Sequence, residues 1–270
     1  MRHSIFKGYA QTSAGQVHYR ESVGPAAGLT PIVFFHRSPM SGATFEAVFS
    51  ALAGWRRLVA FDVPGFGQSC PLAEGATLPQ IAEILSEAMQ ALAIDEAHLV
   101  GHHSGCAIAA EMAAVPGNAI RSIMLDGVMI ADQEARRSGV PAAPPPEISR
   151  EGEYLAAAWG FLQPYYTVFE PHLLHDGLVG ALQSLFTRGP TMAAIRDHDL
   201  KETLSRVTCP VLASAAADDV FATHLDGVPA VLPDAEVHRY GPAGIAGPEL
   251  QPDAFAGLVR RTVALGVSPA

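Results

Sequence analysis

The chain has 270 residues, of which 49% are apolar and 16% are charged, and its formal charge is −10. This composition allows a large buried core and excludes an intrinsically disordered chain. Because a negatively charged surface repels phosphate backbones and anionic lipids, we expect neither nucleic acid nor a membrane as a partner. No apolar run reaches the ~18 residues of a membrane span, and the first residues lack the apolar segment of a signal peptide. The sequence therefore predicts a cytoplasmic protein.

The cysteines are Cys70, Cys106 and Cys209, an odd number without a C-x-x-C pair. This pattern suits a reducing compartment and argues against a disulfide framework or a structural zinc site. The sequence also lacks a G-x-G-x-x-G turn after its first buried strand, which disfavours redox chemistry with a dinucleotide. We therefore expect neither a metal nor a cofactor.

The first half of the chain alternates between predicted strands and helices. Residues 4–11 and 15–21 favour a β-hairpin with Gly15 at its turn, and Thr77 with Gln80 makes a capping box at the start of a helix. The elements expected next are strands at 31–35, 58–61, 97–100 and 120–125, and helices at 45–52, 77–88 and 107–114. This order predicts a mostly parallel sheet with helices on both faces.

Residues 131–200 break this alternation. They contain prolines at 141 and 144–146, followed by helical segments rich in aromatic residues and without a clear strand. Regular elements return afterwards, as strands at 210–213 and 235–240 and a helix at 255–262. The simplest account is one α/β core, formed by residues 1–130 and 201–270, with a helical cap inserted at 131–200 that is longer than an ordinary connection.

The segment 101–105, Gly-His-His-Ser-Gly, lies between a predicted strand and a predicted helix. It resembles the nucleophile elbow of α/β hydrolases, a G-x-Nuc-x-G turn whose glycines let strand and helix approach closely. The two glycines bracket His103, where the family usually has serine. Reading Ser104 as the nucleophile would put larger residues at both crowded positions, so Ser104 is the residue whose backbone N–H would help form an oxyanion hole.

Two further segments agree with this resemblance. His36-Arg37-Ser38-Pro39 is similar to the His-Gly-x-Pro loop that supplies the second oxyanion donor, although Arg37 stands where glycine is usual. Residues 62–69 match the D-x-P-G-F-G-x-S turn of the family, the most specific local match in the chain. The resemblance covers residues 30 to 130 and implies an α/β-hydrolase fold with a central sheet, helices on both faces and an inserted cap. His36, Arg37 and Ser38 are thus candidates for oxyanion or substrate binding.

The resemblance implies an acid but not the usual histidine. Counting from Pro210 places Asp219 at the position of the family's catalytic aspartate. The usual Gly-His pair aligns with Gly244 and Ile245, and no histidine follows His238. Two of the three positions of a Ser-His-Asp triad are therefore changed, so we do not expect ordinary serine-hydrolase chemistry.

A histidine at the elbow reaches farther than a serine and titrates near neutrality. With Ile245 in place of the usual base, His103 has room to contact Asp219 directly. Such a dyad suits general acid–base chemistry on a small, largely apolar carbonyl compound: C–C or C–O lysis, or hydrolysis through an activated water. The oxyanion donors would stabilise an enolate or a tetrahedral intermediate equally well. A covalent acyl-imidazole would need a second base, which the sequence does not provide.

Several alternatives stay open at this stage. The protein could be an ester or lactone hydrolase in which His103 activates water, or a non-catalytic binding protein with an inert His103. Asp219 could cap a helix, and Arg37 could face solvent rather than a substrate carboxylate or carbonyl. We expect the Ser104 hydroxyl to make a local hydrogen bond and His36 to be structural more than catalytic.

The remaining candidates are aromatic and histidine side chains. We expect an aromatic cluster to hold the cap to the core, with Trp159 among the residues that touch substrate; its members are Trp159, Phe161, Tyr165, Tyr166 and Phe169. His102 is expected to point away from the pocket because its neighbour points into it. His224 or His238 would replace the missing base only if the alignment is shifted. A homodimer, the commonest oligomer, stays open.

Overall fold

The computed structural model describes residues 4–24, 28–132, 134, 135, 137, 147–167 and 169–267. The prolines at 141 and 144–146 lie outside these residues. Within them the chain forms an eight-stranded sheet in the order β1-β2-β4-β3-β5-β6-β7-β8. The strands are β1 (Ile5–Thr12), β2 (Gly15–Ser22), β3 (Ile32–Phe35), β4 (Leu58–Phe61), β5 (Glu96–His102), β6 (Ala119–Asp126), β7 (Val211–Ala216) and β8 (Glu236–Tyr240). β1 pairs antiparallel with β2, and β2 with β4, while all other neighbours are parallel.

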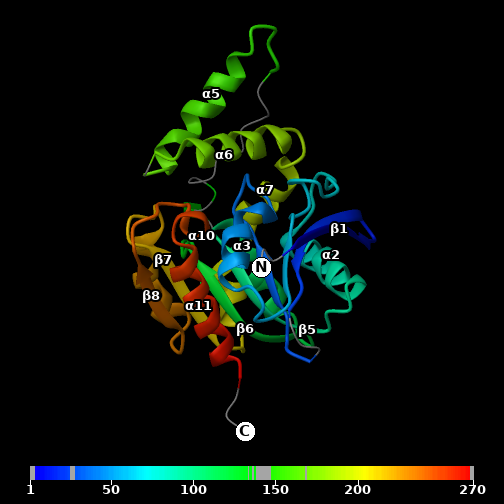
Figure 1. Ribbon diagram of the computed structural model, residues 1–270, viewed down its shortest axis with the longest axis vertical. Helices are drawn as coiled ribbons and strands as arrows, with labels where there is room; N and C mark the ends of the chain where they lie inside the picture. The colour runs from blue at the N-terminus through cyan, green and yellow to red at the C-terminus, as the bar shows by residue number, and fades with distance from the viewer. Residues whose placement is uncertain are drawn as a thin grey trace.

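Helices cover both faces of the sheet (Figure 1). Val33 and Phe35 of β3 belong to the core cluster that includes α2 (Leu78–Ala91) and α3 (Ser104–Ala114). Ile32 and Phe34, which point the other way, pack with α1 (Glu46–Ala51) and α11 (Pro252–Leu265). Because both faces of the central strands are buried, their sequences are apolar throughout rather than alternating. The fold class expected from the sequence is confirmed.

Local signals predicted the elements well, with differences at helix starts. The capping box of Thr77 and Gln80 begins α2, as expected. α3 starts at Ser104 rather than 107, because its first turn contains glycine and serine and so has no apolar periodicity. The helix expected at 45–52 is shorter and follows a 3₁₀ turn, η1 (Gly42–Phe45).

Between β6 and β7 the regular elements that the structure describes are all helices. They are α5 (Glu153–Leu162), η2 (Gln163–Tyr165), α6 (Pro171–Gln183), α7 (Gly189–Asp197) and α8 (Leu200–Ser205). α5 and α6 lie together at one end of the molecule (Figure 1). Thr187 and Thr191 tie this insertion to the core by donating hydrogen bonds to the carbonyl groups of Gly65 and Pro64.

The predicted aromatic cluster forms only in part. Tyr166 is buried and packs with half-buried Trp159 and Tyr165, but Phe161 is 66% exposed and Phe169 is 68% exposed. The expectation of a buried position was wrong for these two phenylalanines, although the ring of Phe161 contacts that of Tyr165 with centroids 5.5 Å apart. For Phe161, the physical reason is that α5 contacts mainly α6 and η2 among the described elements and extends away from the core.

Short helices connect the last strands: η3 (Ala222–Gly227) and α9 (Val228–Val231) follow β7, and α10 (Gly247–Leu250) follows β8. Among the described residues, no helix has both the length and the apolar composition that crossing a membrane requires.

Candidate active site

His103 occupies a sharp turn between β5 and α3. Its backbone has φ 49° and ψ −111°, a conformation that side chains rarely adopt. A Cβ atom on Gly101 would lie 2.5 Å from the carbonyl oxygen of Gly105, and a Cβ on Gly105 would overlap the carbonyl oxygen of Phe35. Only glycine fits at these two positions. The same steric requirement, applied to the sequence, identified His103 as the residue at the centre of the turn.

The imidazole of His103 contacts the carboxylate of Asp219. The distance from Nε2 to Oδ2 is 2.7 Å, and the two side chains are 9% and 1% exposed. Asp219 follows β7, and its Oδ1 accepts a hydrogen bond of 2.7 Å from the backbone N–H of Phe221. One carboxylate oxygen therefore fixes the local turn while the other orients His103. Asp219 is not the cap residue of η3, which is Phe221.

The hydrogen bonds decide which nitrogen of His103 is available as a base. Burial alone would raise the pKa of Asp219, but the hydrogen bond and charge of His103 and the Phe221 amide lower it. Because an ionised carboxylate only accepts hydrogen bonds, Nε2 of His103 carries a proton. Nδ1 makes no hydrogen bond to any residue that the structure describes. In the neutral ring, Nδ1 is thus the unprotonated nitrogen.

Three neighbours fix the plane of the His103 ring. The rings of His102 and Phe221 lie with their centroids 4.7 and 5.1 Å from it. A Cβ on Gly127, which has φ +66°, would lie 2.5 Å from Cδ2 and 2.6 Å from Nε2 of His103. Gly127 was not among the predicted site residues, although a glycine directly after a buried strand is a signal of close approach.

Ser104 changes the expected oxyanion hole. Its Oγ accepts a hydrogen bond of 2.7 Å from the backbone N–H of Ser38. The N–H of Ser38, a candidate for oxyanion or substrate binding, is therefore already engaged, and the Ser104 hydroxyl bonds a residue 66 positions earlier rather than a local group. The remaining donors are the Ser104 N–H, which has no partner within the first turn of α3, and the Ser104 O–H itself.

Arg37 does not face solvent or an open pocket. Its side chain is 2% exposed, with Nη1 donating to Oε1 of Glu249 at 2.7 Å and Nη2 to the hydroxyl of Tyr166 at 3.2 Å. Because Glu249 already compensates the guanidinium charge, the geometry does not favour recognition of a substrate carboxylate. Arg37 instead joins the loop after β3 to the insertion and to α10. Glu249 was missed because 212 residues separate it from Arg37.

His36 is also structural rather than substrate-binding. Its Nδ1 donates to the carbonyl of Arg37, and its Nε2 accepts from the backbone N–H of Val63, both at 2.9 Å. Burial lowers the pKa of His36, so the neutral ring joins the turns after β3 and β4. The candidate role in oxyanion or substrate binding is corrected accordingly.

His102 is completely buried, and its ring lies against the ring of His103. Its Nδ1 lies 2.8 Å from Oδ2 of Asp126, and its Nε2 lies 3.0 Å from the carbonyl oxygen of Ile245. Ser214 and Tyr240 donate further hydrogen bonds to the Asp126 carboxyl group. The backbone of Ile245 thus takes part in this network, a contact that the sequence does not reveal.

The other candidates lie outside the dyad. His238 pairs with Glu236 on β8, and the ring of Phe221 lies between His103 and His224. Trp159 is half-buried in the cluster around Tyr166 described above. Among the described residues, no group of three His, Cys, Asp or Glu side chains is placed to hold a metal ion.

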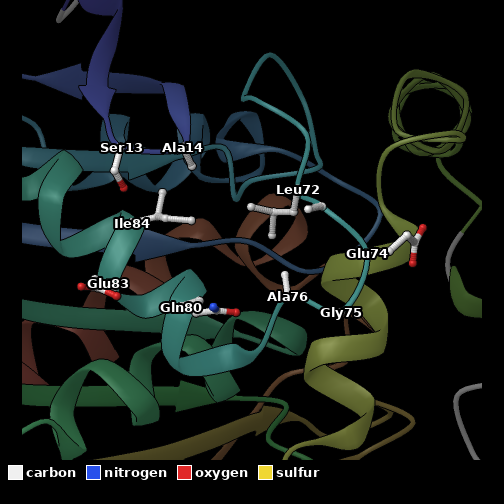
Figure 2. A pocket seen from close by; sticks show the side chains of 10 residues that line it. Ser13, Ala14, Leu72, Glu74, Gly75, Ala76, Gln80, Glu83 and Ile84 are labelled. Atoms are coloured by element: carbon white, nitrogen blue, oxygen red, sulfur yellow. The ribbon is translucent and has the colours of Figure 1, made fainter.

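Figure 2 shows a surface hollow elsewhere on the molecule. It has a volume of about 370 Å³ and lies between the β1–β2 turn, the loop 72–76 and the first turns of α2. None of the candidate site residues lines it, so the hollow is separate from the His103–Asp219 dyad.

Comparison with known proteins agrees with this architecture. A family model described as alpha/beta hydrolase fold matches residues 30–157. The structure of a hydrolase from Pseudomonas aeruginosa PA01 superposes with a TM-score of 0.78 at 22% identity, covering 95% of this chain and 98% of that one. The chain has the α/β-hydrolase fold.

Two characterised relatives are similar over most of their length. A non-heme chloroperoxidase from Streptomyces lividans is 25% identical over 82% of this chain and 86% of its own. A bifunctional esterase/perhydrolase from Acinetobacter calcoaceticus is 25% identical over 78% of this chain and 82% of its own. Both relatives carry the names of enzymes.

The contact between Gly127 and His103 can be tested by Gly127→Ala. The added methyl group would overlap the imidazole and strain the backbone at positive φ, so we expect unfolding free energy to fall by roughly 1 kcal/mol or more. Urea denaturation measures the change. Gly257→Ala, on an exposed part of α11 where a Cβ meets nothing within 4 Å, is the control and should be stabilising by roughly 0.5–1 kcal/mol. Equal effects of the two substitutions would contradict the contact.

The buried ion pair makes a second prediction. Arg37→Met leaves the Glu249 carboxylate buried without its counter-charge, so we expect a loss of about 3–5 kcal/mol in unfolding free energy. Adding Glu249→Leu should recover much of that loss, as measured by denaturation of both variants. For comparison, Arg239→Met removes an exposed pair with Asp226 and should cost less than about 1 kcal/mol. A double variant as unstable as Arg37→Met would exclude the proposed charge compensation.

Proposed function

We propose that this chain is a hydrolase for small, largely apolar esters or lactones in which His103 activates water as a general base. The observation that carries the proposal is the His103–Asp219 hydrogen bond. This bond keeps the proton of the neutral imidazole on Nε2 and leaves Nδ1 able to accept a proton from water. With the side chain of His103 only 9% exposed, the base is shielded from bulk water, which favours a small substrate. The ring of Phe221 beside it favours an apolar one.

The reaction needs no nucleophile from the protein. Nδ1 of His103 takes a proton from water as the oxygen attacks the substrate carbonyl, and Asp219 stabilises the imidazolium that forms. The resulting oxyanion accepts hydrogen bonds from the N–H and O–H of Ser104. Collapse of the tetrahedral intermediate breaks the C–O bond, and the imidazolium returns the proton to the leaving oxygen. The products are a carboxylic acid and an alcohol, or a hydroxy acid from a lactone.

A direct attack by His103 on the substrate is less consistent with the geometry. An acyl-imidazole formed at Nδ1 would need another base to activate water for its hydrolysis. The nearby candidates are already engaged: His102 by Asp126 and Ile245, and His36 by Arg37 and Val63. General-base activation of water needs only His103, which first accepts a proton from water and later returns it to the leaving oxygen.

We further propose that residues 131–200 act as a cap that limits substrate size. Tyr166 of the insertion reaches Arg37, and Thr167 donates a hydrogen bond to Asp218, the neighbour of Asp219. These contacts connect the insertion to the loops that carry the dyad. The expected partner remains a small molecule, and the proposed reaction uses no cofactor.

The test is turnover of a panel of small esters, lactones, β-diketones and hydroxyketones by the wild type and by His103→Ala. Removing the base should lower kcat/KM about 10²–10⁴-fold. The control is His238→Ala, which removes a partly exposed histidine paired with Glu236 and should leave turnover unchanged.

The products separate the alternatives. Incorporation of one solvent oxygen supports hydrolysis, whereas cleavage of a hydroxyketone without added water would indicate a lyase that uses the same dyad. If His103→Ala turns over every substrate as fast as the wild type, the mechanism is wrong. If neither protein is active on the panel while both bind its members in thermal-shift assays, the protein is a binding protein rather than an enzyme.

A further inference from the structure

Behind the proposed base lies a second histidine–aspartate pair, His102 and Asp126. Both side chains are fully buried, with exposed fractions of 0%, and their hydrogen bond measures 2.8 Å. Neither residue contacts the reacting atoms in the mechanism above. Burying such a pair is costly unless its protons are matched to its hydrogen bonds, so the contacts constrain the protonation state.

The contacts fix the number of protons that the pair holds. Nε2 of His102 lies 3.0 Å from the carbonyl oxygen of Ile245, and a carbonyl can only accept, so Nε2 carries a proton. The bond between Nδ1 and Oδ2 of Asp126 needs another proton, on either the nitrogen or the oxygen. Together, His102 and Asp126 therefore hold one proton more than a neutral imidazole beside a carboxylate.

Burial decides where this additional proton resides. Loss of hydration raises the pKa of Asp126 to about 7. It also lowers the pKa of His102 well below its ordinary value, and the charges of His103 and Arg37 act in the same direction. Both shifts favour a neutral imidazole that accepts a hydrogen bond from a protonated carboxyl group, rather than an imidazolium facing a carboxylate.

Other titratable groups face the pair from every side. The ring of His103 lies against His102, and the hydroxyl of Tyr240 donates to Oδ2 of Asp126 at 3.2 Å. Burial and the neighbouring Asp126 raise the pKa of Tyr240, which therefore remains a donor. Asp219 acts through its charge, raising the pKa of both members of the pair. The Arg37–Glu249 ion pair contributes two opposed charges at His102.

The pair is also connected mechanically to the proposed base. The backbone carbonyl of Asp126 accepts the N–H of His103 at 2.8 Å, and the next residue, Gly127, contacts the His103 ring. His102 holds the Ile245 carbonyl, four residues before Glu249, the partner of Arg37.

We propose that His102 and Asp126 share a single additional proton and, in this state, act as positioning residues that hold His103 and the Ile245 segment in place. Loss of that proton has a defined consequence. The one proton left on His102 would move to Nδ1 to bond the Asp126 carboxylate, and the Ile245 carbonyl would lose its donor. Protonation of Asp126 thus determines which tautomer His102 adopts and whether the Ile245 segment is bonded to β5. The link to turnover rests on the proposed function, but the protonation state does not.

The protonation state is tested by NMR of the protein with ¹⁵N-labelled histidine. In mildly acidic solution we expect His102 to be neutral with its proton on Nε2, and to change to the Nδ1–H tautomer as pH rises through about 7. In Asp126→Asn the amide N–H donates to Nδ1 at every pH, so the change should disappear. An imidazolium at His102, or a tautomer that does not respond to pH in the wild type, would overturn the proposal.

Stability provides a second measurement that does not depend on activity. A raised pKa means that folded Asp126 binds its proton more tightly than the unfolded chain, so its stabilising effect is present below about pH 4 and is lost as pH rises to about 7. The melting temperature of Asp126→Asn, relative to the wild type, should therefore rise across this interval. A constant difference would contradict a proton held by Asp126, and a variant that does not fold leaves the NMR measurement on the wild type decisive.

The positioning role is tested with any substrate found in the panel. We expect wild-type kcat/KM to decline on the alkaline side as the Ile245 bond is lost, and Asp126→Asn to keep its plateau there. If both proteins show the same alkaline profile, the pair does not position the site even if it shares a proton. Absence of all turnover would reject the proposed function alone, because the NMR and stability results would still decide the protonation state.

Discussion

The close approach of three backbone segments at the turn after β5 is the constraint on which the site depends. Gly101 and Gly105 allow β5, the start of α3 and the end of β3 to lie within contact distance, and this forces the residue between them into a positive φ. A side chain there projects from the sheet edge at the N-terminus of α3, where unpaired backbone N–H groups also point. The conformation is held by neighbours, since the His103 N–H bonds to the Asp126 carbonyl. Any side chain at position 103 therefore lies next to the unpaired backbone N–H groups at the start of α3.

The histidine side chain at position 103 determines what surrounds it. The imidazole fills space that a smaller side chain would leave open, reaches Asp219 without an intermediate residue, and requires glycine at 127. The backbone carbonyl of Ile245 lies against His102. The single ring of His103 thus accounts for the direct contact with Asp219, while the Ile245 segment bonds to β5 in the core.

The sequence predicted those features that depend on local sterics and periodicity. Glycine spacing identified His103, the strand patterns gave the sheet, and the count from Pro210 located Asp219, which the structure places against His103. It could not give contacts that depend on how distant loops meet. Glu249 and Arg37 are distant in sequence, and Asp126 at the end of a strand carries no sign that it will be buried against His102. The charge of Arg37 suggested that it binds a substrate, because the sequence does not show that Glu249 lies next to it. The exposed side of α5 was misread for a related reason, since apolar periodicity shows that a helix has an apolar face but not whether another element covers it.

The two histidine–aspartate pairs lie side by side but differ in protonation because their surroundings differ. Asp219 receives a backbone N–H and a ring N–H on separate oxygens, which stabilises its charge and lowers its pKa. Asp126 receives hydroxyl donors only, in a place without solvent, and its pKa rises to about 7. Charge on both carboxylates would place two anions around adjacent histidines, so ionisation of one disfavours ionisation of the other. A proton on Asp126 therefore helps to keep Asp219 ionised, and an ionised Asp219 is what leaves Nδ1 of His103 free to accept a proton.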